Sequence, residues 1–386
     1  MRILLFTGKG GVGKTTVAAA TAAQIAAGGL RTVVLSTDPA HSLADAFDVS
    51  LGDVPTPISP RLWGQQLNAR VRFEDAWEDV RSYMVGVLDW AGADAVEAEE
   101  LAVVPGLDEV FALADIKQFA TSGDFDAVVV DCAPTAETIR LLSLPDILAW
   151  YMDRLFETQR RLTKLTRPIL DRVTSLPIAG DRVFTAIRRF YDRLDGVRDL
   201  LTDGDITSAR LVVNPERMVV AEARRTYTYL SLFGYHVDAV IANRMLPAAI
   251  DDPWFARWKA TQSAHLESIN DAFRPLPVLS AELADCELVG LDDLAAFGAA
   301  LYADCDPAHR LADIEPLRVD AVGSSLVLSV YLPFTERADV DLARNDDELF
   351  LTVGPHRRAL VLPDSLLRRE VAGARLAGDR LEVEFV

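Results

Sequence analysis

The sequence predicts a doubly wound α/β domain with a mainly parallel sheet, followed by a small antiparallel β-sandwich. Three observations predict this fold class. Short apolar runs rich in β-branched residues alternate with helical stretches, and a Gly-rich loop joins the first run to the first helix. After Asp306-Pro307, alternating apolar and polar residues replace that rhythm. Continuous apolar runs are typical of strands buried on both faces, whereas alternation is typical of half-exposed antiparallel strands.

The first part of the chain contains the runs that we expect to form the parallel sheet. The first helix is expected over Thr15–Ala27, because Gly28-Gly29 can cap its C-terminus. The strand-and-helix order is that of an open α/β sheet. The expected strands are Ile3–Thr7, Thr32–Ser36, Ala127–Asp131, Arg210–Val213, Val237–Ala242 and Pro277–Leu279.

The chain of 386 residues exceeds the roughly 100–200 residues of one typical domain, so we expect two. Residues 1–303 are assigned to the α/β domain, with helical insertions at about 60–122 and 145–203. Residues 316–386 are assigned to the β-sandwich.

Apolar residues recur at helical spacing within both insertions, and one further helix is expected over about Leu107–Ser122. These apolar stripes either form intramolecular core or line an exposed groove for an apolar client.

Three strands of the sandwich are visible as alternating triplets of apolar residues. Turn-forming pairs, such as Gly323-Ser324 and Gly378-Asp379, separate the strands. The triplets are Leu326, Leu328 and Val330; Leu349, Leu351 and Val353; and Leu381, Val383 and Phe385.

The net charge of −19 disfavours nucleic acids and anionic membrane surfaces as partners, because both attract basic proteins. The sequence has no run of 18 apolar residues, so we do not expect an integral membrane protein. Three cysteines without a Cys-x-x-Cys pair fit a reducing cytoplasm better than a disulfide framework or a zinc site.

The loop Gly8–Thr15 fits the pattern G-x-x-x-x-G-K-[ST] and lies between an expected strand and an expected helix. Main-chain N–H groups of such a loop bind phosphates, together with the positive end of the helix dipole. Lys14 would neutralise the β- and γ-phosphates of ATP, Thr15 would bind Mg²⁺ and Thr16 would reach the α-phosphate. The expected loop contacts are Gly10, Gly11, Val12, Gly13, Lys14, Thr15 and Thr16.

Lys9 precedes the central glycines and gives the loop the deviant form Lys-Gly-Gly-Val-Gly-Lys-Thr. In the P-loop subclass with this form, the first lysine crosses a dimer interface to the nucleotide of the facing subunit. The alternative is that Lys9 faces solvent.

Two acidic residues follow expected strands and would lie beside the loop. Asp38 could polarise the attacking water, or it could cap a helix. Asp131 ends a hydrophobic strand, as the Walker-B residue does, and would hold Mg²⁺ directly or through water. Asn243 ends another strand, where its amide suits the adenine edge, although a simple turn role is the alternative.

These residues together resemble the arsenical pump-driving ATPase (ArsA) family, which also contains ATPases that target tail-anchored membrane proteins. The resemblance implies a homodimer that closes around two ATP molecules, with Lys9 acting in trans, Asp38 positioning water and Asn243 contacting adenine. The tail from about Leu317 resembles the α-crystallin-like domain of some bacterial members. The matching segments are Gly8–Thr16, Asp38–Ser42, Pro105–Glu109, Asp131–Thr135 and Asn243-Arg244.

The sequence departs from the family pattern at two places. The second switch has Ala136 and Glu137 where Gly and His are common, which puts the coupling of hydrolysis to client binding in doubt. The zinc clasp of eukaryotic members is absent, because Trp254, Phe255 and Trp258 occupy that stretch without any cysteine.

Three functions remain open. The first is an ATPase that couples nucleotide binding and hydrolysis to an apolar client or a membrane-protein partner. The second is the energising subunit of an arsenite or antimonite pump, although the placement of Cys132, Cys286 and Cys305 favours inert cysteines over a metalloid site. The third is a nucleotide-gated scaffold with little turnover.

Overall fold

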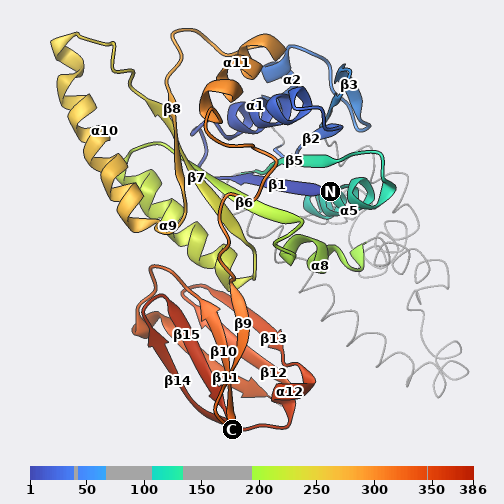
Figure 1. Ribbon diagram of the computed structural model, residues 1–386, viewed down its shortest axis with the longest axis vertical. Helices are drawn as coiled ribbons and strands as arrows, with labels where there is room; N and C mark the ends of the chain where they lie inside the picture. Colours follow the sequence, from blue (N-terminus) through green and yellow to red (C-terminus); the bar gives the residue numbers. More distant parts are fainter. Residues whose placement is uncertain (39–41, 67–106, 134–193, 346) are drawn as a thin grey trace, which may run out of the picture. The chain divides into compact units, whose positions relative to one another are not determined.

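The computed structural model describes the chain except for residues 39–41, 67–106, 134–193 and 346. The chain divides by contact into two compact units, and the first contains 1–66, 119–140 and 199–386. The fold class expected from the sequence is confirmed within this first unit (Figure 1). The first expected helical insertion was wrong at its start, because residues 62–66 form a strand that pairs with the strand Thr32–Ser36. Most of the rest of the two insertions, and the apolar stripes in them, lie outside the described residues.

The large sheet has eight strands in the described residues, in the order β3-β4-β2-β5-β1-β6-β7-β8. Only β3 runs antiparallel to its neighbour β4. Every other pairing in this sheet is parallel. The strands are β1 (Arg2–Thr7), β2 (Thr32–Ser36), β3 (Thr56–Ser59), β4 (Leu62–Gln66), β5 (Ala127–Asp131), β6 (Thr207–Val213), β7 (Val237–Met245) and β8 (Val278–Glu282).

The central strands β1, β2, β5 and β6 are buried along their whole length, which explains why their sequences do not alternate. The pairing register brings three strand ends to one level, because Asp131 on β5 faces both Phe6 on β1 and Ser36 on β2. The carboxyl ends of the central strands therefore form a common edge.

Helices cover both faces of this sheet (Figure 1). Helix α1 packs on β1, β2 and β5 and against α11, whereas α9 packs on β6 and β7. The helices with described bounds are α1 (Lys14–Ala27), α2 (Ser42–Phe47), α5 (Leu107–Ser122), α8 (Val197–Thr202), α9 (Arg217–Leu232), α10 (Pro253–Ala272) and α11 (Leu291–Leu301).

A charged cluster that the sequence did not predict is buried near the amino-terminal ends of β1, β6 and β7. Asp238 is fully buried and accepts hydrogen bonds from Arg2 at 3.2 Å, from Arg210 at 3.1 Å and from Ser208 at 2.8 Å. The main-chain N–H of Leu311 also donates to Asp238. One carboxylate thus joins β1, β6, β7 and the segment that leads to the C-terminal strands.

The C-terminal strands form two antiparallel sheets, in the orders β14-β15-β10-β9 and β11-β12-β13. The triplets expected from alternation lie mainly inside, and Leu349, Leu351 and Val383 have no exposed surface. The strands are β9 (Leu317–Val322), β10 (Ser325–Tyr331), β11 (Val340–Asn345), β12 (Glu348–Val353), β13 (His356–Val361), β14 (Val371–Ala377) and β15 (Arg380–Phe385), with short helices η1 (Arg337–Asp339) and α12 (Asp364–Leu367).

The C-terminal end of α9 contacts these strands and their connections. The ring of Tyr227 packs against the rings of Tyr331 and Phe334, with centroids 5.8 and 6.4 Å apart. The Thr228 hydroxyl donates to the carbonyl of Pro333, and the buried Arg358 guanidinium donates to the carbonyl of Leu232. The contact therefore combines aromatic packing with buried hydrogen bonds.

Candidate nucleotide-binding site

The loop between β1 and α1 has the backbone that phosphate binding requires. Gly13 precedes α1 with φ +90°, and no side chain caps the N–H groups of the first helical turn. At two glycines of the loop, neighbouring residues leave no room for a side chain. A Cβ on Gly8 would lie 2.2 Å from the carbonyl oxygen of Val212, and one on Gly13 would lie 2.5 Å from Asn243 Nδ2. Glycine at these positions allows the loop to lie directly against β6 and β7.

The two lysines of the loop differ in their surroundings. Lys14 is buried, and its ammonium group donates to the carbonyl oxygen of Lys9 at 3.3 Å, so it folds back over the loop. The Lys9 ammonium has no hydrogen-bond or ion-pair partner among the residues that the structure describes. The charge of Lys14 thus lies beside its own loop, whereas the charge of Lys9 could interact with a second molecule.

Oxygen ligands converge where β2 and β5 end beside α1. Asp131 Oδ2 accepts hydrogen bonds from the Thr15 hydroxyl at 2.8 Å and from the Ser36 hydroxyl at 3.2 Å. Asp131 is fully buried, and its Oδ1 has no hydrogen-bond partner within the described part of the chain. Burial raises the pKa of Asp131 to about 6, and the hydrogen bond from Thr15 and the charge of Lys14 act against that increase.

This oxygen set fits Mg²⁺. A hydroxyl and a carboxylate with one buried oxygen left over are hard oxygen ligands, and Mg²⁺ takes few protein ligands beside phosphates and water. The described residues contain no group of three or more His, Cys, Asp or Glu that could hold a metal ion by themselves.

Asp38 lies just beyond the carboxyl end of β2, and its main-chain N–H donates to the Ser36 hydroxyl at 3.2 Å. Thr37 joins this segment to the end of β5, because its hydroxyl accepts from the Ala133 N–H at 3.0 Å. Helix α2 is described from Ser42 onward, after residues that lie outside the described part of the chain, so a helix-cap role for Asp38 stays an alternative. Pro39, Ala40 and His41, and the second-switch residues Thr135 to Thr138 with Ala136 and Glu137, lie outside the described residues.

Asn243 lies near the end of β7 and faces the loop. Its Nδ2 donates to the carbonyl oxygen of Val12 at 2.8 Å, and the residue is buried. One amide hydrogen is therefore used to hold the loop, which leaves Oδ1 and the second hydrogen for a ligand.

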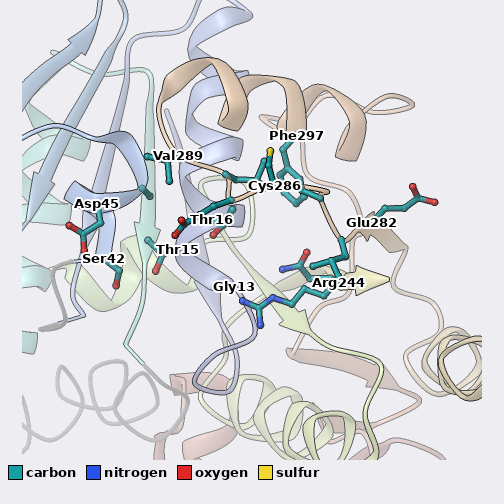
Figure 2. A pocket seen from close by; sticks show the side chains of 16 residues that line it. Gly13, Thr15, Thr16, Ser42, Asp45, Arg244, Glu282, Cys286, Val289 and Phe297 are labelled. Carbon is teal, nitrogen blue, oxygen red and sulfur yellow. The ribbon is translucent and has the colours of Figure 1, made fainter. Parts of the chain in front are cut away.

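A pocket of about 350 Å³ opens beside the first turn of α1 (Figure 2). Gly13, Thr15 and Thr16 line one side of it, Ser42 and Asp45 of α2 come next, and Asn243 and Arg244 lie at the end of β7. The remaining lining comes from α11 and from the segment between β8 and α11, as Glu282, Leu283, Ala284, Cys286, Glu287, Leu288, Val289 and Phe297.

Comparison with known proteins decides the family. The model of the anion-transporting ATPase (ArsA) family matches residues 1–303. The chain belongs to the ArsA ATPase family. A model described as an HSP20-like domain found in ArsA matches residues 323–385, within which β10 to β15 lie.

Relatives from several organisms match most or all of the chain. A Prosthecochloris vibrioformis protein named "Putative arsenical pump-driving ATPase" is 38% identical over 100% of this chain and 96% of its own length. An Aquifex aeolicus protein named "Putative arsenical pump-driving ATPase 1" is 34% identical over 99% of both chains. The Arabidopsis thaliana protein "ATPase GET3B" is 31% identical over 76% of this chain and 77% of its own length.

Membership of the ArsA family identifies the chain as an ATP hydrolase that uses ATP as its nucleotide. None of the helices in the described part of this ATPase combines the length and apolar character that crossing a bilayer requires.

Sequence reasoning missed three parts of this ArsA site. Ser36 is the second hydroxyl on Asp131, and Thr37 joins the ends of β2 and β5. The apolar wall around Leu288 and Val289 lies in a segment without strand or helix periodicity. A polar residue at the end of a buried strand was the signal for Ser36 and Thr37, whereas the wall had no motif.

Proposed function

We propose that this ATPase hydrolyses MgATP at a site completed by a second copy of the chain, and that closure of the homodimer drives binding of an apolar client. The observation that carries the nucleotide part is the convergence of Thr15, Ser36 and Asp131 beside an uncapped helix N-terminus. The oxygen ligands and the free N–H groups meet where a polyphosphate with its metal ion needs both.

Each element of the loop has its own part in binding. Main-chain N–H groups from Gly10 to Gly13 and Thr16 would hold the β- and α-phosphates, and Lys14 would neutralise the β- and γ-phosphates. Thr15 and Asp131 would hold Mg²⁺, which would supply charge neutralisation on the β- and γ-phosphate oxygens when bound.

Asp38 would orient and polarise the attacking water. The water oxygen forms a bond to the γ-phosphorus while the bond from that phosphorus to the bridging oxygen of ADP breaks. The carboxylate of Asp38 accepts the proton that the water loses. Asp38 is half-buried, and its main chain is held by Ser36, so its position relative to Asp131 is defined by the same hydrogen-bond group.

Lys9 would supply the second cation from the partner copy. Its ammonium has no partner in the described residues, whereas Lys14 already folds over its own loop. Charge on the transferring phosphoryl group would attract Lys9 across the interface, as an arginine finger supplied in trans does.

The proposal is tested by mixing two inactive variants, Lys9→Ala and Asp38→Asn. In a mixed dimer, one site has an intact Asp38 and receives Lys9 from the other copy. We expect equal mixing to restore about a quarter of wild-type turnover, since half of the dimers are mixed and one site in each is complete. Absence of any recovery, with mixed dimers demonstrated by differential tagging, would show that Lys9 does not act in trans. High turnover by Asp38→Asn alone would show that Asp38 does not position the water. Nucleotide-dependent assembly that survives in Asp38→Asn without turnover would favour a nucleotide-gated scaffold.

The client is proposed to be an apolar segment or a membrane-protein partner, bound by the helical insertions. Support for this part comes from the apolar residues at helical spacing in the sequence of 73–88 and 155–194. Nucleotide-dependent capture of an apolar peptide would test it directly, and capture that does not change with nucleotide would contradict it.

A metalloid pump is the second candidate, because two full-length relatives carry arsenical pump-driving names. Three thiols would have to converge, but Cys132 is buried after β5, Cys286 is exposed in the pocket wall and Cys305 is half-buried after α11. Stimulation of ATP turnover by arsenite would support this candidate, and a flat response across a wide titration would exclude it.

A further inference from the structure

Arg244 is a charged pocket residue that the site described above does not use. It follows Asn243 on β7, lines the pocket and extends toward the loop at Gly13 (Figure 2). Its Nε lies 3.9 Å from the position that a Cβ on Gly13 would occupy. The guanidinium makes no hydrogen bond or ion pair with any residue that the structure describes. A planar cation is thus presented to the ligand side of the pocket.

The backbone of Arg244 is held in a conformation that few arginines adopt. Its φ is +58°, in the left-handed region, which is uncommon for a residue other than glycine. Gln262 of α10 fixes the segment on both sides, because its Nε2 donates to the Arg244 carbonyl at 3.2 Å and its Oε1 accepts from the Leu246 N–H at 2.8 Å. Residues held in such conformations by their surroundings cluster at ligand sites.

The segment before α11 contributes apolar side chains to the pocket wall, and these side chains are open to solvent. Leu283 and Val289 are 44% and 41% exposed, and Leu288 and Phe297 continue the wall, so exposed and half-buried apolar side chains lie together at this pocket. A planar aromatic ligand would cover these side chains on one face and the guanidinium on the other.

Phosphate is a poorer match for this part of the pocket. Glu287 lines it together with Arg244, and a carboxylate opposes a polyphosphate. The phosphate-binding features lie instead at Gly13, Thr15 and Thr16. The charge distribution therefore separates a phosphate side at the helix N-terminus from a base side at Arg244.

We propose that Arg244 stacks on the adenine base of bound ATP, and that its guanidinium plane and the apolar wall form the two faces of a purine slot. Asn243 holds the loop beside this slot, and Arg244 determines affinity and base preference. This inference rests on ATP occupying the site proposed above.

Calorimetric titration of the full chain with ATP, CTP and inorganic tripolyphosphate tests the proposal. Arg244→Gly removes the side chain without imposing strain at positive φ, and Arg244→Lys keeps the charge but removes the plane. Arg257→Ala, on the exposed surface of α10, is the matched control for net charge. We expect both Arg244 variants to weaken ATP binding about tenfold and to lose preference for ATP over CTP. Tripolyphosphate should bind all four proteins within about twofold, because it does not reach the slot, and its binding also shows that each variant is folded.

The outcomes separate the possibilities. If Arg244→Gly weakens tripolyphosphate as much as ATP, or if Lys restores ATP affinity, Arg244 contacts phosphate and the stacking proposal is wrong. If both variants bind ATP as the wild type does, Arg244 makes no contact and the proposal is wrong. If the wild type fails to bind ATP but the controls are folded, the proposed nucleotide site itself is wrong.

Discussion

The Thr15 hydroxyl donates a hydrogen bond to Asp131 Oδ2 over 2.8 Å, although the two residues are 116 positions apart in the chain. The parallel pairing of β1 with β5 produces this contact, because it brings the start of α1 and the end of β5 to one edge. The contact between Thr15 and Asp131 therefore depends on the order of the strands in the sheet as well as on the loop motif.

Thr15→Ala should strongly reduce ATP turnover. Removing the hydroxyl takes one oxygen from the expected Mg²⁺ position and one hydrogen bond from the buried Asp131, so we expect turnover to fall about 100-fold. Thr15→Ser, which keeps the hydroxyl, should remain within a fewfold of wild type. Steady-state rates over a range of Mg²⁺ concentrations measure the effect. Equal rates for the Ala and Ser variants would show that the hydroxyl has no part in turnover.

Asn243→Ala should loosen the phosphate-binding loop. The amide donates to the Val12 carbonyl at 2.8 Å from a buried position, and losing that bond leaves the carbonyl unsatisfied. We expect the Kd for ATP to rise about tenfold, which corresponds to ~1.4 kcal/mol. Asn243→Asp should be worse than Ala, because it directs a carboxylate oxygen at the Val12 carbonyl. An Asp variant with wild-type affinity would contradict the hydrogen bond as described.

Asp238→Ala should destabilise the protein severely. The substitution leaves Arg2 and Arg210 buried without their carboxylate, and such losses cost about 3–5 kcal/mol in the free energy of unfolding. Urea unfolding followed by circular dichroism measures the loss. The control is Asp126→Ala, whose partner Arg31 is 43% exposed in its side chain, so the same substitution should have a much smaller effect. A similar decrease in the free energy of unfolding for both variants would show that burial of the ion pair does not determine its contribution to stability.

His236 should make stability depend on pH below about 6.5. Burial, followed by the charge of Arg310, lowers the pKa of His236, while Asp313 and Glu315 act in the opposite direction. Arg310 Nη2 donates to His236 Nδ1 at 3.0 Å, which requires a neutral nitrogen there. The unfolded chain therefore binds a proton before the folded one as the pH falls, and stability decreases from about pH 6.5 downward. Unfolding titrations at pH 5–7.5 should show this slope in wild type and a reduced slope in His236→Gln. An unchanged slope would assign the pH dependence to other groups.

Removal of residues 316–386 should not leave a well-behaved ATPase fragment. Tyr227 is 2% exposed in the intact chain, and its ring would lose Tyr331 and Phe334. We expect the truncated protein to bind the dye ANS and to aggregate, because a large aromatic surface would become exposed. Light scattering and dye fluorescence measure this. A monodisperse fragment with wild-type thermal stability would show that α9 does not depend on the C-terminal strands.

Much of this architecture could be predicted from the sequence, and the exceptions have identifiable causes. The buried strands and the first helix were visible because burial on both faces gives continuous apolar runs. The hairpin of β3 and β4 was not, since Gln65 and Gln66 are polar residues buried near the sheet edge. Asp238 looked like any other acidic residue, because its two arginine partners lie on other strands.

Site residues could be predicted where they belong to a short sequence motif. They could not be predicted where only the order of the strands in the sheet brings them together. Thr15 and Asp131 each follow a recognisable strand and were assigned to one metal site, a role that stays a prediction. Ser36 and Arg244 join them only because β2 and β7 end at the same edge. The apolar pocket wall comes from a connecting segment, for which a single sequence provides no periodicity.

The attachment of the C-terminal strands to α9 has a practical consequence for experiments. Hydrogen bonds from Thr228 and Arg358, together with the contact between the Tyr227 and Tyr331 rings, hold the HSP20-like region against one helix. A fluorophore placed on that region will report tilting of α9 and not the swing of a tethered module. Distance measurements between such a label and the α/β sheet would therefore test whether α9 moves when nucleotide binds.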